Sequence, residues 1–516
     1  MPLRATISYF KELRTWHIFV LLFLLAFIPR LIFINQGLFE HDSVQLAKAT
    51  EESLTELSIH SAVGGRHGFV LITTIIYAFF HYIFNHQTAE FSVTVATILL
   101  SSLAVPIIYL FIKELLNNRF VAITTSILFS LNPVFLVITT YAKSNGPGIF
   151  FVMLSGYLLV KALKTDKKIY WLLSSSAFAF SLLVRSDNIL YLVLFGMIYF
   201  FPSRVIAGYN SKFMTFDMKR IIVGTIPAAT LLILELRFKL FTISTNYTIP
   251  IEFSWQFLKV LLWHLFSLSV ILVISLTPII LIFTLISIAY LIYKKNHGMV
   301  LFSLIWFLSI FLPLGMLKVA TPRFYAASFI PIIILICLFL HRIYQTRKFV
   351  AILIIVILAV QSFIIAYPII SFRHDYSGPK QMSLFIEEKT PESSVIVSDD
   401  YSVFLDYYAK RKTINYPLSH DKGEMLRFYE TVYDLVSNGT HVYMPSYILR
   451  TNVHCSSAML TNFKLTSIGK VVIEDYHHSE LAIQNETVDI FRITTREDVN
   501  KSSLKYPEEN IVRIFI

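Results

Sequence analysis

The chain has 516 residues, of which 55% are hydrophobic and 15% charged, and its formal net charge is +11. Its mean hydropathy of +0.65 is well above that of an ordinary soluble domain, which excludes a wholly soluble protein. The positive charges are scattered over short loops between apolar runs and form no Lys/Arg-rich face, so we expect no nucleic-acid partner.

Apolar runs long enough to cross a membrane recur from residue 16 to residue 370 and then stop. Residues 1–370 carry 28 Lys and Arg against 13 Asp and Glu, whereas residues 371–516 carry 16 against 20. We therefore expect a polytopic α-helical membrane domain, 1–370, followed by a C-terminal domain, 371–516. The apolar runs are 16–35, 68–84, 91–112, 120–140, 148–163, 169–184, 188–202, 221–241, 263–293, 298–317, 324–341 and 349–370.

The segment after the first apolar run carries an unusual group of ionisable residues. Residues 36–43 read Gln-Gly-Leu-Phe-Glu-His-Asp-Ser, which places the carboxylates of Glu40 and Asp42 beside His41 at the membrane edge. Ionisable groups at this depth cost free energy unless they have a partner or a function. The pattern of residues 42–57 then predicts a short amphipathic helix that lies on the membrane.

The next motif, Gly-Gly-Arg-His-Gly at 64–68, predicts a flexible basic turn whose backbone could approach an anion closely. Taken alone, a plain loop before a helix is the more frequent role of such a sequence. The run that follows, 68–84, is short and contains Thr73, Thr74 and His81, which favours an interfacial helix.

The basic residues predict the topology. If the run 68–84 does not cross the membrane, 15 of the basic residues between 85 and 370 lie on the cytoplasmic side and 7 lie outside. If it does cross, 7 lie on the cytoplasmic side and 15 lie outside. Because positive loops favour the cytoplasm, we predict about eleven spans, interfacial helices in a long first external loop (36–90), and an extracytoplasmic C-terminal domain. All the Asn-x-Ser/Thr sites then lie outside, at Asn246, Asn438, Asn485 and Asn500.

The C-terminal domain alternates strand and helix patterns. Strands are predicted at 394–399, 441–444, 471–475 and 488–494, and helices at 401–409 and 424–436. These elements predict a small α/β domain. No Gly-rich nucleotide-binding fingerprint accompanies them, and we assign the domain no catalysis.

An external carboxylate beside a bilayer can act as a general base toward an incoming hydroxyl group. A phosphate leaving group needs cations that stabilise its developing charge, and Arg66 and Arg323 are the candidates. Together these groups would permit inverting sugar transfer from a lipid phosphate to a hydroxyl. Other roles remain open, since Asp42 could cap the helix that it precedes and Arg323 could be a membrane-edge arginine. Arg185 and Asp187 flank a tight turn between two apolar runs, and this position favours a structural ion pair.

Several motifs of the membrane part, in their order, resemble the GT-C superfamily of polyprenyl-phosphate-sugar-dependent glycosyltransferases. The resemblance is greatest to the branch with dolichyl-phosphate-mannose protein mannosyltransferases and lipid A aminoarabinose transferases, and it covers the whole membrane part. The segments that carry it are PRLIFINQGLFEHDSVQLAKA (29–49), GGRHGFVLITTIIYAFF (64–80), SLNPVFLVITTYAKSNGPGIFF (130–151), LLVRSDNILYL (182–192) and TPRFYAASFIPIIIL (321–335).

The resemblance implies roles for individual residues. Asp42 would activate the acceptor, and Arg66 and Arg323 would contact the lipid phosphate. Ser43 and Asn145 stand where the family usually has acids, so no obligatory metal or other cofactor is expected, although a divalent metal is a possible ligand. The remaining substrate-binding candidates are Glu40, His67, Asn145 and Tyr325.

We thus expect an integral-membrane glycosyltransferase of the cell membrane with an external active site. Its partners would be membrane lipid, a polyprenyl- or dolichyl-phosphate sugar donor, and a hydroxyl acceptor on a protein, glycan or lipid. The alternative is a lipid-linked-sugar flippase or transporter, but no paired Gly/Pro-interrupted spans occur in the two halves. A structural or sensory membrane protein would leave Asp42, Arg66 and Arg323 without a shared role.

Overall fold

A computed structural model gives the fold, and it divides the chain into two compact units. One contains Met1–Ile34 and Ala49–His374, and the other contains Asn35–Lys48 and Asp375–Ile516. The residues described are 15–60, 66–85, 88–207, 209, 259, 266, 269, 270, 272, 273, 276–315, 322–399, 401–417, 421–451, 453–477, 482–497, 499 and 501–504. The predicted span 221–241, the first part of 263–293 and Gly64-Gly65 lie outside these residues.

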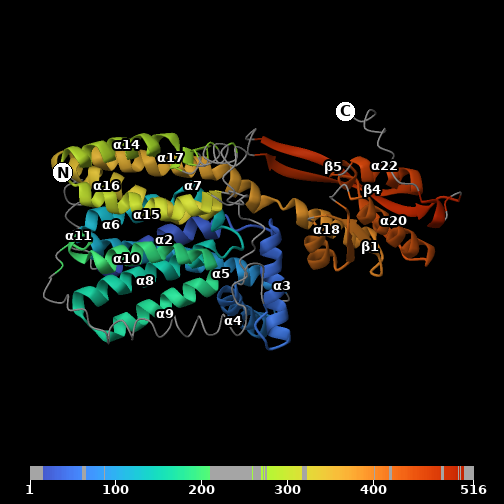
Figure 1. Ribbon diagram of the computed structural model, residues 1–516, viewed down its shortest axis with the longest axis horizontal. Helices are drawn as coiled ribbons and strands as arrows, with labels where there is room; N and C mark the ends of the chain where they lie inside the picture. Colours follow the sequence, from blue (N-terminus) through green and yellow to red (C-terminus); the bar gives the residue numbers. More distant parts are fainter. Residues whose placement is uncertain are drawn as a thin grey trace. The chain divides into compact units, whose positions relative to one another are not determined.

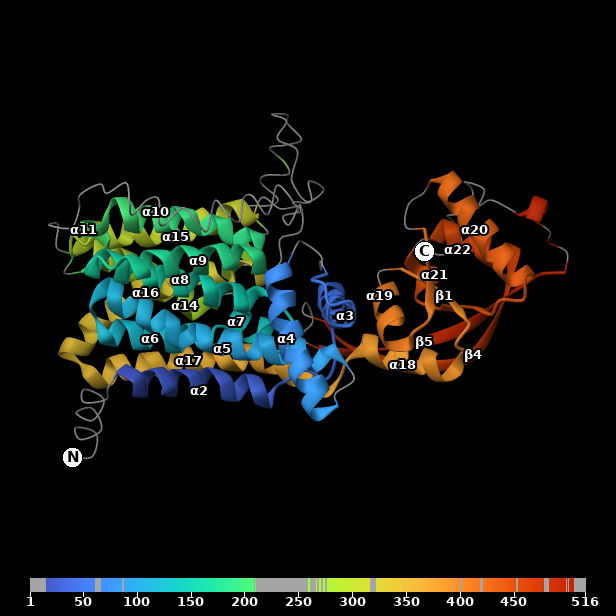
Figure 2. The same ribbon diagram turned by 90° about the horizontal axis from the view of Figure 1, so that it is seen from below.

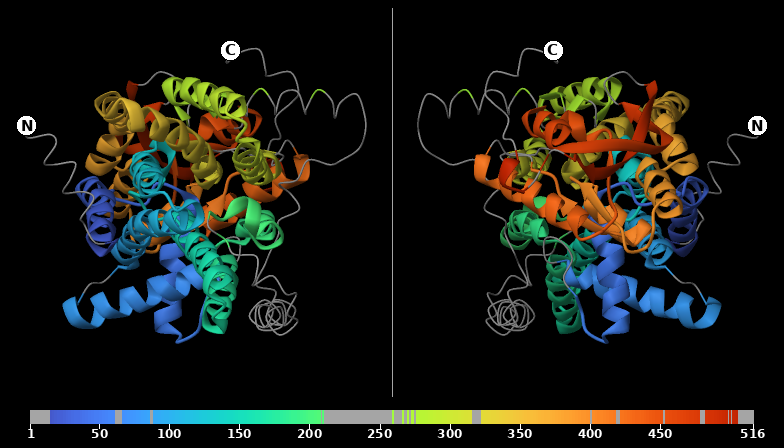
Figure 3. Two further views of the ribbon diagram at one scale, coloured as in Figure 1. Left: turned by 90° about the vertical axis from the view of Figure 1, so that its left-hand side faces the viewer. Right: turned by 90° about the vertical axis from the view of Figure 1, so that its right-hand side faces the viewer.

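The first unit is a bundle of helices, whose common direction is clear in Figure 1 and in the end-on views of Figure 3. The helix α5 lies inside it and packs against α2, α6 and α8. Its serines and threonines are buried with its aliphatic side chains, so both faces meet protein. The bundle helices are α2 (Thr15–Ile32), α5 (Ala89–Leu116), α6 (Arg119–Ser130), α8 (Asn145–Thr165), α9 (Lys168–Val184), α10 (Leu192–Phe200), α14 (Pro278–Tyr293), α15 (His297–Gly315), α16 (Phe329–Thr346) and α17 (Lys348–Asp375).

The bundle has the surface of a membrane protein. Large apolar side chains point outward along α17, among them Leu353, Val360 and Ile364. Within the described residues, seven helices are long and apolar enough to cross a membrane. These findings confirm a polytopic helical membrane protein. The number of eleven spans and the sidedness remain predictions.

The helix α4 (His67–Phe84) is arranged differently from the bundle. Figure 2 shows it lying across the end of the bundle, crosswise to α5 and α17. Its length and composition would allow a crossing. The crosswise direction favours the interfacial position predicted from its threonines and histidine.

The predicted span 120–140 is interrupted in the middle. The helix α6 ends at Ser130, and α7 (Pro133–Ile138) begins after Asn132, whose side chain caps it. Pro133 lacks the N–H that would continue α6, so carbonyl groups at this break need other donors. Arg30 of α2 supplies one, because its Nη2 donates to the Ser130 carbonyl at 3.1 Å.

The second unit contains the predicted α/β domain, built on a sheet with the order β2-β1-β3-β5-β4. The strand β1 pairs in parallel with β2 and β3, whereas β5 pairs antiparallel with β3 and β4. Its strands are β1 (Val395–Ser398), β2 (Lys412–Asn415), β3 (Val442–Pro445), β4 (Phe463–His477) and β5 (Ala482–Thr495), and its main helices are α18 (Gly378–Lys389), α20 (Lys422–Ser437) and α22 (Val453–Asn462).

The four predicted strands are confirmed with shifted ends, and α20 confirms the helix predicted at 424–436. The helix predicted at 401–409 is instead a short helix, α19 (Ser402–Phe404), continued by a π-helical turn, η5 (Leu405–Ala409). The strand β2 was not predicted, because it is a four-residue edge strand whose side chains are at most half-buried. The hairpin strand β4 is longer than predicted, since residues 463–470 lack a simple apolar alternation.

Candidate active site

Asp42 lies in the first turn of α3 (His41–Thr55). The Glu40 carbonyl accepts hydrogen bonds from the backbone N–H of Ser43 at 2.8 Å and of Val44 at 3.2 Å. Glu40 therefore occupies the capping position, and the alternative in which Asp42 caps this helix is wrong. An ionised carboxylate in the first turn is stabilised by the helix dipole. Ser43 is fully buried at the position where the resembled family carries a second acid.

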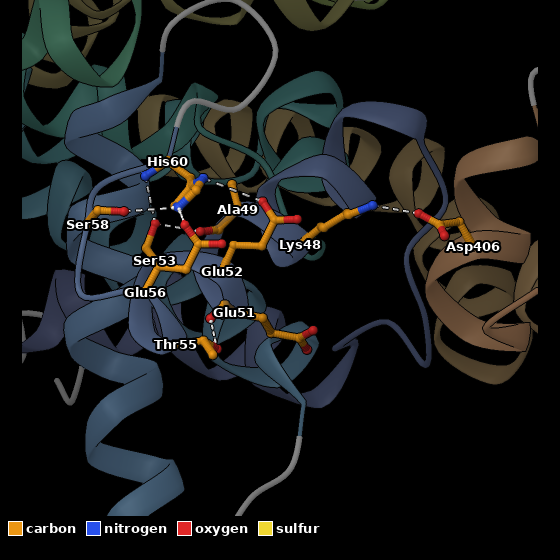
Figure 4. Close-up of polar contacts among 10 residues, drawn as sticks. All are labelled: Lys48, Ala49, Glu51, Glu52, Ser53, Thr55, Glu56, Ser58, His60 and Asp406. Carbon is orange, nitrogen blue, oxygen red and sulfur yellow. Dashed lines mark hydrogen bonds and ion pairs between the residues drawn. The ribbon is translucent and has the colours of Figure 1, made fainter. Parts of the chain in front are cut away.

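Polar contacts hold α3 along its length (Figure 4). In the second unit, Lys48 Nζ lies 2.6 Å from Asp406 Oδ2. In the first unit, the chain folds back after α3 and brings His60 Nε2 to 2.8 Å from Glu56 Oε2. The backbone N–H of His60 donates a hydrogen bond to Ser53 Oγ. Both ion pairs are exposed, so each adds little to the stability of the helix that carries Asp42.

Arg66 and His67 begin α4, close to the end of α9. The two helices can approach here because Gly68 has no side chain. A Cβ atom added at this position would lie 2.9 Å from Leu183 Cβ and 3.1 Å from the Val184 backbone nitrogen. Only glycine permits this approach of the two backbones. The basic motif is therefore held against the turn that follows α9.

The turn after α9 contains the Arg185–Asp187 ion pair that the sequence predicts. Arg185 donates from Nε to Asp187 Oδ1 at 2.9 Å and from Nη2 to Oδ2 at 2.7 Å, in the two-pronged geometry that arginine favours. Burial alone would raise the pKa of Asp187. The charge and hydrogen bonds of Arg185, with the nearby charge of Arg66, outweigh burial and lower the pKa below its ordinary value.

This ion pair borders an open pocket, in which about 350 Å³ of space is free of protein atoms, part of it open to solvent. Two predicted site residues meet there, since Asn145 Nδ2 donates to the Arg323 carbonyl at 3.1 Å. The lining residues come from the start of α8, the helical turn η1 (Ser186–Tyr191), α15 and the helical turn η4 (Pro322–Ser328). They are Asn145, Ile149, Arg185, Asp187, Asn188, Tyr191, Ile310, Leu314, Arg323, Phe324, Ala326 and Ala327.

Two glycines in the Asn-Gly-Pro-Gly sequence of 145–148 shape this pocket. A Cβ at Gly148 would lie 3.0 Å from Arg185 Cδ and 3.1 Å from Asn188 Nδ2. At Gly146 a Cβ would collide with the hydroxyl of Ser101 on α5. The start of α8 can therefore approach both α5 and the ion pair, which brings Asn145 to the pocket wall.

The structure brings together part of the predicted site. Asn145 and Arg323 line the pocket, and Arg66 with His67 lies against the adjoining turn. Tyr325 is not among the residues that line the pocket; it is fully buried, and its ring centre lies 4.9 Å from that of Phe311. Asp42 and Glu40 belong to the second unit.

Sequence reasoning did not assign Asn188 and Tyr191 to the site, and it gave Arg185 and Asp187 only a structural role. The signal available was the polar Arg-Ser-Asp-Asn stretch, 185–188, between two apolar runs. Polar residues at such a position have either a partner or a ligand. The local pattern could not show that a second turn, with Arg323, faces this one.

The family model for dolichyl-phosphate-mannose-protein mannosyltransferase matches residues 71–215. Among solved structures, the chain resembles ArnT from Cupriavidus metallidurans bound to undecaprenyl phosphate, with 11% identity, a TM-score of 0.59, and coverage of 92% of this chain and 97% of that one. It also resembles the archaeal oligosaccharyltransferase AglB from Archaeoglobus fulgidus, with 11% identity, a TM-score of 0.56, and coverage of 95% and 75%. No curated protein matches in sequence.

The fold defines the class as a polytopic helical membrane protein, and a polar pocket lies within its helical unit. The family match over residues 71–215 indicates a glycosyltransferase, and the fold of the chain is similar to the folds of ArnT and AglB, which belong to the GT-C superfamily. The resemblance seen in the sequence is thereby confirmed. The roles of the individual site residues remain predictions.

Proposed function

We propose that this enzyme transfers a sugar from a polyprenyl- or dolichyl-phosphate donor to a hydroxyl acceptor on the external face of the cell membrane. The observation that carries the proposal is the pocket where Arg323 and Asn145 meet the Arg185–Asp187 pair. The structures that share the fold support the donor class, since ArnT is bound to undecaprenyl phosphate and AglB to a dolichol-phosphate. The acceptor is a protein, a glycan or a lipid.

In the proposed mechanism, Asp42 accepts the proton of the acceptor hydroxyl. The oxygen then bonds to the anomeric carbon while the bond from that carbon to the phosphate oxygen breaks, and the electron pair remains on the phosphate. Arg66 and Arg323 stabilise the charge that develops on this leaving group. Attack from the face opposite the phosphate inverts the anomeric configuration.

A transfer assay with purified protein tests the proposal. The protein is mixed with a panel of polyprenyl-phosphate sugars and candidate hydroxyl acceptors, and the release of polyprenyl phosphate is measured. We expect release that requires both donor and acceptor. A protein that moves lipid-linked sugars across vesicles without releasing polyprenyl phosphate would instead be the alternative flippase.

We also propose that no divalent metal is obligatory. Ser43 and Asn145 replace acids at two family positions, and Ser43 is buried. Within the described part of the chain, no three His, Cys, Asp or Glu side chains are placed to share an ion. We expect transfer to continue after chelation with EDTA at more than half of the untreated rate. Loss of transfer that added Mg²⁺ or Mn²⁺ restores would contradict this proposal.

The external placement of the site has a separate test. The turn between α5 and α6 is cytoplasmic if eleven spans are present and α4 does not cross. Asn117 lies in this turn in a left-handed conformation that ends α5. In intact cells, an Asn117→Cys variant is expected to resist an impermeant thiol reagent until the membrane is opened. Labelling from outside would overturn the proposed topology.

A further inference from the structure

The segment that leads into α3 is held by side chains of the C-terminal domain. Residues 35–40 belong to no helix or strand, so their backbone groups need partners elsewhere. Lys380 of α18 donates from Nζ to the Gln36 carbonyl at 3.0 Å. The backbone N–H of Leu38 donates to the Tyr408 hydroxyl at 2.9 Å. All these residues belong to the second unit, so the C-terminal domain supplies two of the hydrogen bonds that hold this segment.

The two side chains that bind this backbone also contact one another. Tyr408 belongs to η5 and Lys380 to α18, and these elements pack together. Lys380 Nζ lies 5.4 Å from the centre of the Tyr408 ring, and both residues are half-buried. The ion pair of Lys48 with Asp406, also from η5, is exposed and adds little (Figure 4). Of the polar contacts described, those of Lys380 and Tyr408 therefore hold the segment.

Close packing at Gly37 adds to these hydrogen bonds. A Cβ atom added there would lie 2.7 Å from Ser377 Oγ and 2.8 Å from Ser377 Cβ, at the start of α18. The backbone of Gly37 is not left-handed, so glycine is needed here for space and not for its conformation. Both residues are buried, and the segment therefore lies directly against α18.

The chain between this contact and Asp42 is short. Leu38 is fully buried, and Asp42 follows four residues later in the first turn of α3. The Glu40 carbonyl caps that turn, so a displacement of residues 36–38 would move the Asp42 carboxylate. A general base must lie within hydrogen-bonding distance of the proton that it accepts, and such a displacement would therefore lower the rate.

We propose that the C-terminal domain positions the general base: Lys380 and Tyr408 hold residues 36–38, and this segment places Asp42 for proton transfer. The inference rests on the proposed function, in which Asp42 is the base, and deepens it. Lys380 and Tyr408 are positioning residues and take no part in the chemical step. The domain to which the sequence assigns no catalysis thus acts on the reaction through α3.

The test measures kcat for sugar transfer and, separately, the binding of polyprenyl phosphate to the purified full-length protein. Tyr408→Phe removes the acceptor of the Leu38 N–H, and Lys380→Met removes the donor to the Gln36 carbonyl. Each is expected to lower kcat about three- to tenfold, the scale of one hydrogen bond, and to leave the affinity for polyprenyl phosphate unchanged. Lys380→Arg keeps a cationic donor and is expected to recover most of the loss.

An exchange of space tests the contact at Gly37. Gly37→Ala is expected to lower kcat by about threefold or more, because its Cβ would collide with Ser377. Ser377→Gly removes the colliding atoms, so the double variant Gly37→Ala/Ser377→Gly is expected to recover kcat. The side chain of Ser377 makes no capping hydrogen bond to α18, and its replacement by glycine therefore costs this helix little.

The matched control is Tyr416→Phe. The Tyr416 hydroxyl lies 2.9 Å from Ser456 Oγ inside the same domain, and its removal is expected to leave kcat unchanged. Wild-type kcat in Tyr408→Phe or in Gly37→Ala, an equal loss in Tyr416→Phe, or no recovery in the double variant would overturn the inference alone. Absence of transfer by wild type would overturn the proposed function, and full activity in Asp42→Asn would overturn the assigned base; the inference would fail with either.

Discussion

Replacing Asp42 with Asn is expected to lower the rate of sugar transfer by about 10²–10⁴, the contribution of a positioned general base. Asparagine has nearly the same shape but cannot accept the proton of the acceptor hydroxyl. Asp42 is half-buried in the first turn of α3, where the helix dipole stabilises a carboxylate. The Asn variant removes this charge as well as the proton acceptor. The measurement is kcat with saturating donor and acceptor.

Glu40→Gln is the matched control for this variant. It removes a carboxylate two residues away, at the capping position, where the backbone carbonyl makes the helix contacts. We expect a smaller loss of kcat in Glu40→Gln than in Asp42→Asn. Asp42→Asn is expected to bind the donor as wild type does. Full activity in Asp42→Asn would refute the assignment of this residue as the base.

Replacing Arg30 with Leu is expected to destabilise the membrane bundle by about 1–3 kcal/mol for each buried acceptor that is left without a donor. Arg30 is fully buried. It donates from Nε to Thr139 Oγ1 at 2.7 Å, from Nη1 to the Ala26 carbonyl at 2.7 Å and from Nη2 to the Ser130 carbonyl, while its guanidinium lies 4.9 Å from the Phe135 ring centre. Leucine would leave these acceptors without their donor.

Thermal unfolding of the purified protein in detergent measures this effect. Lys501→Met is the control, because it breaks an exposed ion pair with Asp434 and is expected to leave the unfolding temperature of the bundle unchanged. An Arg30→Leu variant as stable as wild type would show that the broken helix at Ser130 has another source of support.

The sequence predicted the features that depend on neighbouring residues, and it did not predict those that depend on contacts between residues far apart in the chain. The helix at 42–57 and the strand at 394–399 follow from local apolar periodicity, and both are confirmed. The break at Pro133 could have been predicted from proline chemistry. Its repair by Arg30, 100 residues away from Ser130, could not. In the sequence, Arg30 is only a single charged residue within the apolar run 16–35.

The site shows the same division. Asn145 and Arg323 were predicted from their motifs, and their hydrogen bond across 178 residues is a property of the fold. The Arg185–Asp187 pair was predicted as an ion pair from its spacing, and this is confirmed. Its position in the wall of a pocket depends on α8, α15 and η4 together. No local pattern indicates that convergence, and for the same reason Tyr191 was not singled out.

The most direct test of the account follows a labelled sugar on two donors that differ only in the carrier. Purified protein with a suitable hydroxyl acceptor receives the sugar either on a polyprenyl phosphate or on a nucleotide diphosphate. We expect the label to reach the acceptor only from the polyprenyl phosphate, with release of that lipid and inversion at the anomeric carbon. Transfer from the nucleotide-linked sugar, or retention of the anomeric configuration, would contradict the account.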